Sequence, residues 1–395
     1  MNNSSLPVAI IGSGPAALMA AHVIASSGRS VRIFEKKQGP GKKLLIAGSS
    51  GLNVTYDAPL ETFHEFYRGP QDGFKKIFAT FSPNDWLKFI EALGIGTFKG
   101  TSRRYFVEGL KASALLRAWL LRLEKLGATI SYNAECVEFE ALKEKVILRF
   151  ADNSVVEAAA VCFALGGGSY EEREKPLRWP EIFKRKGLRF EKFAPSNVGY
   201  NAAWPAKFIE EAEGLPLKNI VLHTSTGSKQ GDLVITRYGL EGTPIYFHAK
   251  PGTAWLDLAP DLSVEQISER LARIKENLSP IRRLKRCLKL SAAAQALLFH
   301  LSSREELDSL NLLTSKIKRF PIELLEPRSI DEAISTSGGL DWSELDDNLM
   351  LHRHPRVFAA GEMLNWDAPT GGFLIQACVS QGFVAGHGII NYEKL

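Results

Sequence analysis

The fold of this chain is decided by the stretch Val8-Ala9-Ile10-Ile11-Gly12-Ser13-Gly14-Pro15-Ala16-Ala17. Its four apolar residues predict a buried strand, its glycines a tight turn, and residues 15–27 a helix. Gly12 suits the turn, Gly14 lets the backbone approach a pyrophosphate closely, and Ala17 keeps helix and strand near one another. The free amides of the helix N-terminus suit phosphate groups. The stretch therefore predicts the first unit of a dinucleotide-binding fold.

A carboxylate stands where such a fold needs one. Residues 31–34 predict a second strand, and Glu35 follows it, twenty-three residues after Gly12. In dinucleotide folds an acid at about this spacing accepts hydrogen bonds from ribose hydroxyls, and its charge repels a 2′-phosphate. A glycine turn without a ligand is the alternative, but the strand, the helix and Glu35 together favour a binding site.

The composition is that of an ordinary globular protein, with 395 residues of which 45% are hydrophobic and 24% charged. This length allows two or three domains. The apolar runs fall well short of the roughly 20 residues of a membrane span, and no cationic region precedes the first of them. We therefore expect a cytoplasmic protein with no membrane partner.

Four cysteines are widely spaced, with no CxxC pair and no metal-ligand clustering with the histidines. This spacing argues against a metal site and against a disulfide oxidoreductase that uses a CxxC pair beside its flavin. The four are Cys136, Cys162, Cys287 and Cys378.

The net charge of +5 is concentrated in residues 261–320, which hold twelve Lys or Arg and seven Asp or Glu. Within them, residues 282–286 read Arg-Arg-Leu-Lys-Arg, which would suit nucleic acid or an acidic partner. A solvated helix face explains the same charges, and no aromatic side chains for base stacking are interleaved. We therefore do not expect a nucleic-acid partner.

Two further segments are candidates for ligand contacts in the first half of the chain. Residues 39–55 are rich in glycine, with Lys42 and Lys43 near their start, and predict a loop at the carboxyl end of the second strand, beside cofactor phosphate or a flavin ring. An ordinary surface turn is the alternative. Arg103 or Arg104 is a candidate for holding an anionic substrate, with a solvated pair as the alternative.

Strands follow a predicted helix over residues 112–125. An antiparallel meander is predicted for residues 129–132, 136–139, 146–150 and 155–156. Residues 160–169 then read as an apolar strand that ends in three glycines. In a parallel nucleotide-binding sheet such an end brings the backbone beside the cofactor.

The composition changes after Pro195. Residues 221–226, 233–236 and 245–247, separated by glycines, predict short antiparallel strands of a small barrel or sandwich. Helices are predicted to begin at the capping boxes of Ser263 and Ser303. The domains expected from these patterns are a first cofactor-domain part at 1–194, a β-barrel-like insertion at 195–260 and 320–332, a helical insertion at 261–319, and a second cofactor-domain part at 333–395.

The C-terminal part carries three glycine turns close together, within residues 333–340, 356–363 and 367–376. A buried strand predicted just before Gly361 puts Glu362 at its carboxyl end, where the carboxylate would accept hydrogen bonds from a ribityl chain. Gly371 and Gly372 open a final helix. Its positive end suits the electron-rich pyrimidine edge of a flavin.

Taken in order, these motifs resemble the HI0933-like (YhiN/BaiN-like) family of FAD-binding flavoproteins, in particular its subfamily with Gly-Leu-Asn in the second motif. The matches run from residue 7 to about 388, and the middle of the chain is recognised mainly from residues 238–244. The motifs are GSGPAA at 12–17, KKLLIAGSSGLNVT at 42–55, ALGGGS at 164–169, TSGGL at 336–340 and FAAGEMLNWDAPTGGFLIQA at 358–377.

The resemblance implies an α/β fold. It consists of a Rossmann-like FAD-binding domain of the glutathione-reductase type, interrupted by a β-barrel insertion and a helical subdomain. It also implies noncovalent FAD and an oxidoreductase activity. Much of the wider family has Arg-Cys-Asn where this chain has Gly51-Leu52-Asn53. Chemistry assigned to that Arg or Cys therefore does not carry over.

The resemblance also assigns roles along the cofactor. Gly12, Gly14 and Ala17 would hold the pyrophosphate, Glu35 the adenosine ribose, and the backbone of Val137 the adenine. Lys43 and Asn53 would lie along the cofactor, and Gly361 with Glu362 would meet its ribityl and phosphate groups. The amides of Gly372 and Phe373 would meet the flavin ring. The predicted cofactor-binding residues are Gly12, Gly14, Pro15, Ala16, Ala17, Glu35, Lys36, Lys43, Asn53, Val137, Ala164, Gly166, Gly361, Glu362, Gly371, Gly372, Phe373 and Gln376.

Two classes of function stay open. The first is an FAD oxidoreductase acting on a small molecule, with the flavin reduced by NADH, by NADPH or by the substrate itself; an amine oxidase of the aminoacetone oxidase-like kind is one form of it. No second GxGxxG follows a strand, so a dedicated nicotinamide domain is not expected. The second is an RNA-modifying or RNA-binding flavoprotein that uses the basic residues 282–289. No His or carboxylate has a constrained partner, so the catalytic residues stay unassigned.

Overall fold

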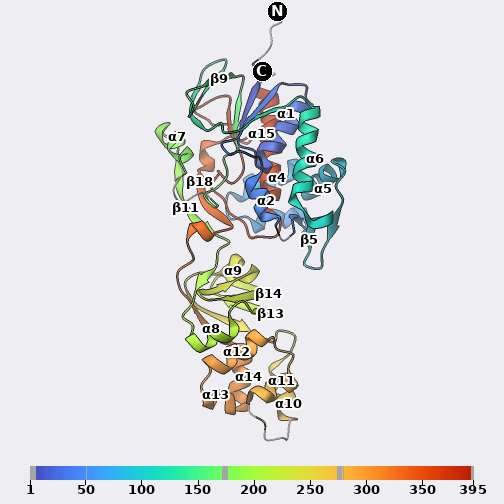
Figure 1. The fold of residues 1–395 in the computed structure, drawn as a ribbon, viewed down its shortest axis with the longest axis vertical. Helices are drawn as coiled ribbons and strands as arrows, with labels where there is room; N and C mark the ends of the chain where they lie inside the picture. The colour runs from blue at the N-terminus through green and yellow to red at the C-terminus, as the bar shows by residue number, and fades with distance from the viewer. Residues whose placement is uncertain (1–5, 50, 171–176, 274–277, 279, 393–395) are drawn as a thin grey trace, which may run out of the picture. The chain divides into compact units, whose positions relative to one another are not determined.

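The structure, a computed structural model, describes residues 6–49, 51–170, 177–273, 278 and 280–392. Ser50 of the glycine-rich segment and residues 274–277 and 279 of the predicted helical insertion lie outside the described residues. The chain divides into two compact units (Figure 1). Unit 1 comprises Met1–Ala194 and Ile334–Leu395, and unit 2 comprises Pro195–Ala333.

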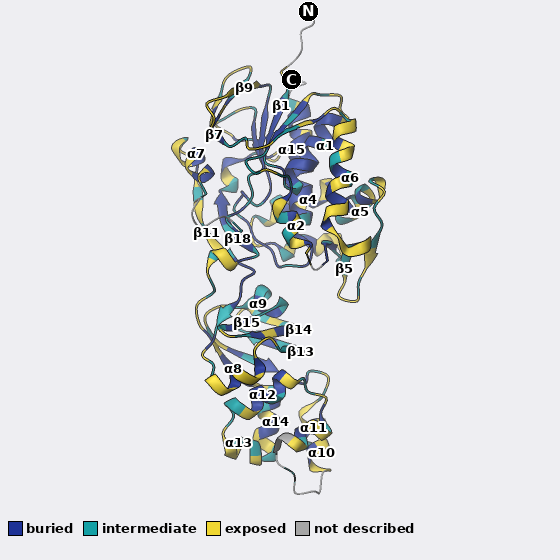
Figure 2. Ribbon diagram, in the orientation of Figure 1, coloured by how far each residue is buried: buried dark blue, intermediate teal, exposed yellow. Residues whose placement is uncertain are grey.

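A parallel sheet forms the centre of unit 1. All residues of its strands β1, β10 and β19 are buried, as Figure 2 shows for β1, because helices and loops cover both faces. Strands in that position must be apolar throughout, as Val8-Ala9-Ile10-Ile11 is. The strand order is β19-β10-β1-β2-β6, with bounds Val357–Ala359, Val161–Phe163, Val8–Ile11, Val31–Phe34 and Thr129–Ser131.

Helix α1 (Pro15–Ser26) packs along helix α15 (Phe373–Tyr392) beside this sheet (Figure 1). Their backbones approach closely, because a methyl group at Gly382 would lie 2.2 Å from the carbonyl oxygen of Ala16. Among the described residues, α15 is the one helix whose length and apolar composition would suffice to cross a membrane, and most of it is buried inside unit 1. The first and last predicted motifs thus form one packed layer.

The predicted meander is wrong in its first strand. β6 (Thr129–Ser131) pairs in parallel with β2, from Arg32 opposite Thr129 to Phe34 opposite Ser131. The preceding helix α6 (Ala112–Lys125) brings the chain back to the same end of the sheet, as a parallel crossover requires. The meander itself contains β7 (Cys136–Ala141), β8 (Val146–Phe150) and β9 (Val155–Ala158).

The glycine-rich segment is not a continuous loop. Its first half forms helix α2 (Lys42–Ala47), and its end forms strand β3 (Asn53–Tyr56), which pairs antiparallel with β5 (Arg104–Val107). Glycines at both ends of α2 confine the helix to six residues. The remaining helices of unit 1 and the third strand of this sheet are α3 (Leu60–Phe63), α4 (Gln71–Thr80), α5 (Pro83–Ala92), α7 (Trp179–Arg185) and β4 (Thr97–Lys99).

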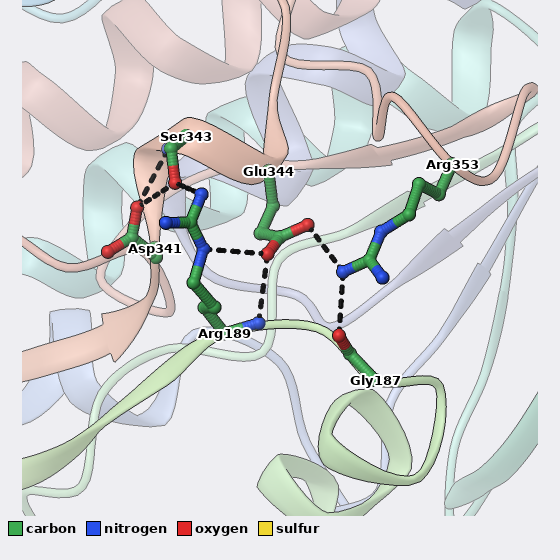
Figure 3. A network of polar contacts seen from close by, with 6 residues as sticks. All are labelled: Gly187, Arg189, Asp341, Ser343, Glu344 and Arg353. Carbon is green, nitrogen blue, oxygen red and sulfur yellow. Dashed lines mark hydrogen bonds and ion pairs between the residues drawn. The ribbon is translucent and has the colours of Figure 1, made fainter.

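Strands β11 (Phe190–Ser196) and β18 (Ser335–Leu340) pair where the chain leaves unit 1 and re-enters it. A network of polar contacts fixes this point (Figure 3). The buried Glu344 accepts from Nε of Arg189 at 3.1 Å and from Nη2 of Arg353 at 2.9 Å, and Arg353 also donates to the carbonyl of Gly187. Burial alone would raise the pKa of Glu344, but the backbone N–H of Arg189 and the two guanidinium groups hold it below its ordinary value.

Unit 2 contains an antiparallel sheet that closes on itself. The strand order is β12-β15-β14-β13-β16-β17. After β17 the chain pairs back onto β12, since the N–H of Leu325 donates to Asn201 and the N–H of Asn201 donates to Glu326. The bounds are β12 Tyr200–Asn201, β13 Pro216–Thr224, β14 Gly227–Thr236, β15 Gly239–Glu241, β16 Gly252–Asp257 and β17 Phe320–Leu324.

One predicted strand of this sheet is wrong. Residues 245–247 lie in helix α9 (Thr243–His248), which begins at Gly242 with Pro244 in its first turn. Gly242 has φ +127°, and proline at a helix start is favourable, so the local signals outweigh the apolar run. The capping boxes predicted at Ser263 and Ser303 are confirmed. The helices of unit 2 are α8 (Ala206–Ala212), α9, α10 (Val264–Ala272), α11 (Pro280–Cys287), α12 (Ala292–Leu301), α13 (Arg304–Asp308) and α14 (Leu310–Lys318).

The contribution of the Glu344 network to the stability of the protein can be tested by substitution. Glu344→Gln should lower the free energy of unfolding at pH 7 by about 2 to 4 kcal/mol, because two arginines lose a buried anionic partner. The folded pKa of Glu344 lies below the unfolded value of about 4.3, so its stabilisation is complete above that pH and is lost as the pH falls through the folded pKa. The difference in the free energy of unfolding between wild type and variant should therefore become smaller as the pH falls.

Denaturant unfolding measured from pH 7 down to pH 3 checks both statements. The matched control is Glu157→Gln, which breaks the surface ion pair with Lys145 and should cost less than about 1 kcal/mol. Equal losses for the two variants would contradict the importance assigned to the buried carboxylate.

Candidate functional site

A cavity lies at the carboxyl ends of β1, β10 and β19, where the parallel strands align. This edge of an α/β sheet is the usual place for a nucleotide. Eleven of the predicted cofactor-binding residues line it. They are Gly12, Gly14, Pro15, Ala16, Glu35, Lys36, Lys43, Ala164, Gly166, Gly361 and Glu362.

The two glycines of the first turn do different things. Gly12 has φ +110°, and a methyl group there would lie 2.3 Å from the carbonyl oxygen of Ala164 on the neighbouring strand. Gly14 has an extended backbone that any residue can adopt, and a methyl group there would meet no protein atom within 4 Å. Gly12 is therefore needed by the protein itself, whereas the space beside Gly14 is open to a ligand at the N-terminus of α1.

Glu35 is held in place on both carboxylate oxygens. The hydroxyl of Ser13 donates to Oε2, and the backbone N–H of Lys37 donates to Oε1 at 2.8 Å. Ser13 is itself buried and accepts from the N–H of Gly41 at 3.2 Å. Each carboxylate oxygen can still accept a further hydrogen bond, so Glu35 keeps the capacity to bind ribose hydroxyls. Sequence reasoning missed Ser13, although it stands between the two glycines of the first motif.

Val137 does not itself line the cavity, but its neighbours Glu135 and Cys136 do. The pairing of β7 with β8 shifts register between Cys136 and Glu138, so Val137 sits at a bulge. Bulges release backbone groups from the strand ladder. The released carbonyl of Val137 accepts a hydrogen bond from Nη2 of Arg185 at 3.4 Å.

Lys43 and Glu362 face the same glycine turn after β10. Nζ of Lys43 donates to the carbonyl of Gly167 at 2.7 Å, and a methyl group at Gly167 would lie within 3.6 Å of Glu362. Burial raises the pKa of the Glu362 carboxyl; Lys43 opposes that shift and Asp367 adds to it. The cavity wall therefore contains a lysine and a carboxyl group whose pKa is raised by burial.

The other predicted residues lie outside this cavity lining. Ala17 is buried one residue further along α1. Gly371, Gly372, Phe373 and Gln376 lie at the start of α15, which packs against β3 and hence near Asn53. A methyl group at Gly372 would lie 2.6 Å from the backbone nitrogen of Thr55.

Phe373 contributes its ring to the protein core and not to a ligand surface. The ring is fully buried and stacks on Phe66, with ring centroids 4.7 Å apart, and its carbonyl accepts from the hydroxyl of Tyr67 at 2.9 Å. Its backbone amide lies in the first turn of α15, where amides have no partner within the helix. Only backbone groups of Phe373 are therefore suited to a ligand.

Unpaired polar atoms gather around the start of α15. Oδ1 of Asn53, Oγ1 of Thr55 and Oε1 of Gln376 are buried and have no hydrogen-bond partner among the described residues. Buried polar atoms in proteins are normally satisfied, so such a cluster indicates a missing polar ligand. A flavin ring, with its carbonyl and ring-nitrogen groups, fits this donor and acceptor set.

Several cavity residues were not predicted at all. Tyr170, Arg178 and Trp179 follow the third glycine motif in a segment without a recognisable pattern, and Cys378 is one turn into α15. Arg103 pairs with Asp57 at the surface, whereas Arg104 lies against Gly371. Among the described residues, no group of three or more His, Cys, Asp or Glu is placed to hold a metal ion.

Comparison with known proteins assigns the chain to a family. The family described as HI0933-like protein Rossmann domain matches residues 6–388. A 3-dehydro-bile acid delta(4,6)-reductase from Clostridium scindens is 22% identical over 407 residues, covering 96% of this chain and 98% of the relative. A ribosomal RNA dihydrouridine synthase from Escherichia coli K12 is 22% identical over 401 residues, covering 96% and 97%.

Solved structures share the fold. A 3-ketosteroid-delta4-(5alpha)-dehydrogenase from Rhodococcus jostii RHA1 has a TM-score of 0.53 at 15% identity, covering 98% of this chain and 97% of its own. A 3-ketosteroid delta1-dehydrogenase from Sterolibacterium denitrificans has a TM-score of 0.54 at 11% identity, covering 98% of this chain and 100% of the dehydrogenase chain.

The two glycines of the first turn allow the pyrophosphate position to be tested. Gly14→Ala should fold, at a cost below about 1 kcal/mol, because its backbone conformation suits alanine and the space is open. It should weaken FAD binding at least about tenfold, because the methyl group occupies the space beside the helix N-terminus. Gly12→Ala should instead destabilise the protein by more than about 3 kcal/mol.

Fluorescence titration with FAD and thermal unfolding of each variant separate these effects. Gly39→Ala is the control, since Gly39 lies outside the cavity lining and a methyl group there meets nothing within 4 Å. If Gly14→Ala binds FAD as tightly as Gly39→Ala, the pyrophosphate does not lie beside Gly14.

Proposed function

The chain belongs to the HI0933-like family and is an FAD-dependent oxidoreductase, and from that premise we propose which residues hold FAD, what reduces it and what it acts on. The observation that carries the proposal is the division of the predicted residues into two adjoining groups. One lines the cavity at the strand ends, and the other surrounds the start of α15 with unpaired polar atoms. Bound FAD supplies the hydride and electron transfer of the reaction.

The residues of the cavity suit the adenosine and phosphate half of FAD. The N-terminus of α1 beside Gly14 holds the pyrophosphate, Glu35 accepts from the adenosine ribose, and the bulge at Val137 meets the adenine. Lys43 and Glu362 hold the ribityl and phosphate groups. This order follows the strand ends and is supported by the open space beside Gly14.

The start of α15 suits the flavin ring. The amides of Gly372 and Phe373 point out of the first helical turn. Asn53, Thr55 and Gln376 supply oxygen atoms that have no hydrogen-bond partner in the described part of the chain. The family's Arg and Cys are replaced here by Gly51 and the fully buried Leu52. Any proton needed by the substrate must therefore come from another group or from water.

We propose that the substrate is a small molecule with a carbon–carbon double bond conjugated to a carbonyl group, and that NADH or NADPH supplies the hydride. Both full-length relatives carry names that describe saturation of such a bond, in a 3-dehydro-bile acid and in uridine. FAD bound at this site would supply the hydride chemistry that saturation of such a bond requires. A substrate-reduced amine oxidase is the competing possibility.

Anaerobic titration of the FAD-loaded protein with NADH and then NADPH tests the reductant. We expect one of them to bleach the visible flavin absorption at a rate far above that of free FAD at the same concentration. A 3-oxo-delta4,6 bile acid added afterwards should restore the absorption.

The other outcomes each exclude a part of the proposal. Bleaching by aminoacetone but by neither nicotinamide would identify an amine oxidase. Bleaching by a nicotinamide without reoxidation by the bile acid would exclude this conjugated bile acid as the electron acceptor. A protein that takes up no FAD would overturn the cofactor site itself.

RNA is a second candidate substrate, favoured by one specific observation. Helix α11 exposes Arg282, Lys285 and Arg286 on the surface of unit 2, and two relatives are named ribosomal RNA dihydrouridine synthase. Cations in such a row neutralise phosphates and make binding dependent on salt.

The RNA candidate is tested by gel mobility of ribosomal RNA at low and high salt. If RNA is the substrate, Arg282→Glu with Lys285→Glu should weaken binding at least about tenfold at low salt and flatten its salt dependence. Arg304→Glu with Arg319→Glu, which reverses the same amount of charge elsewhere in unit 2, is the control. Equal effects of the two pairs, or no RNA binding by wild type, would exclude this candidate.

A further inference from the structure

The guanidinium group of Arg104 is held over the turn from which α15 begins. A methyl group on Gly371 would lie 2.9 Å from Nε of Arg104 and 3.5 Å from its Cζ. The position follows from the strand pairing, since Arg104 in β5 lies opposite Tyr56 in β3. The ring of Tyr56 packs on Phe373 of α15, with centroids 4.8 Å apart. The strand thus fixes a cation beside the helix N-terminus.

That position is electrostatically unfavourable for a cation in the protein alone. The N-terminus of a helix carries a positive partial charge, so arginine is stabilised at the opposite end. α15 runs from Phe373 to Tyr392, and Arg104 lies at its positive end. Arg104 is also half-buried, and burial lowers its pKa. Natural proteins break such local rules mainly at functional sites.

A second, independent feature at the same place indicates a ligand. Thr55 and Gln376 are both fully buried, yet Oγ1 of Thr55 and Oε1 of Gln376 have no hydrogen-bond partner among the described residues. Both lie at the start of α15, since the backbone of Thr55 abuts Gly372 and the N–H of Gln376 donates to the Gly372 carbonyl at 3.0 Å. A ligand with both an N–H group and a negatively charged edge would satisfy these atoms, because the amide oxygen of Gln376 accepts from an N–H and the hydroxyl of Thr55 can donate. The negative edge would also be attracted to Arg104.

We propose that Arg104, acting together with the N-terminus of α15, stabilises the negative charge on the pyrimidine half of reduced FAD and so raises the reduction potential of the flavin. The inference rests on the proposed function, in which the flavin ring lies at this helix start. When a donor transfers a hydride to N5 of the flavin, the electron pair gained by the ring leaves negative charge at N1 and the C2 oxygen. A cation beside those atoms favours the reduced form over the oxidised form.

Sulfite binding tests this assignment without any substrate. Sulfite forms a sulfur–nitrogen bond at flavin N5, and the displaced electron pair leaves the same negative charge at N1 and the C2 oxygen. We expect Arg104→Gln to raise the sulfite dissociation constant at least tenfold. The two-electron reduction potential should fall by about 30 mV for each tenfold loss of relative stability of the reduced flavin.

Two variants and one further measurement separate charge from structure. Arg104→Lys keeps the charge and should stay within threefold of wild type. Arg103→Gln removes an arginine that pairs with Asp57 at the surface, and should leave sulfite binding unchanged. Thermal unfolding of the FAD-free full chain should show no loss of stability in Arg104→Gln, because the substitution removes a cation from the positive end of α15.

The inference is overturned if Arg104→Gln has the same sulfite dissociation constant and the same two-electron reduction potential as Arg103→Gln. It is equally overturned if Arg104→Lys loses as much as Arg104→Gln, or if Arg104→Gln lowers the thermal stability of the FAD-free chain while the potential stays unchanged. These failures differ from failure of the proposed function, in which wild type itself would take up no FAD.

Discussion

The close approach of the turn after β1 to the end of β10 is the constraint on which the site depends. Gly12 and the Ala164 carbonyl lie so near each other that even a methyl group would not fit between them. This contact draws the carboxyl ends of the parallel strands together. The same edge then carries Glu35, Lys43 and Glu362, which come from segments far apart in the chain. The proposed nucleotide site therefore depends on a backbone contact that only glycine at position 12 permits.

At the start of α15, by contrast, several contacts are unfavourable for the stability of the protein alone. Its glycines let β3 and β5 lie directly against the helix terminus, and this brings Arg104 to a place where its charge is unfavourable. Among the described residues, Oγ1 of Thr55 and Oε1 of Gln376 are left without a hydrogen-bond partner. Each of these features lowers the stability of the protein alone. In the proposed function, a bound flavin ring would compensate for these features. The contact at Gly12 is thus required by the fold itself, whereas the start of α15 carries features that only the proposed ligand would offset.

Much of the fold was predictable from local signals. The apolar run before Gly12 and the capping boxes at Ser263 and Ser303 each specify a strand or a helix start by chemistry that acts within a few residues. The failures have a common cause. β6 left the expected meander because α6 carried it to the parallel sheet, and residues 245–247 became helical because Gly242 and Pro244 initiate α9. Apolar runs of three or four residues do not specify their partner.

The sequence by itself determined that this chain binds a dinucleotide, because glycine turns, the acid after the second strand and the helix starts are local features with local physical reasons. The tertiary structure alone decided which residues meet. Ser13 orients Glu35, the bulge at Val137 releases its backbone, and Arg104 reaches Gly371, more than 250 positions away in the chain. Such contacts depend on strand pairing and helix packing between distant segments, for which spacing along the chain carries no signal.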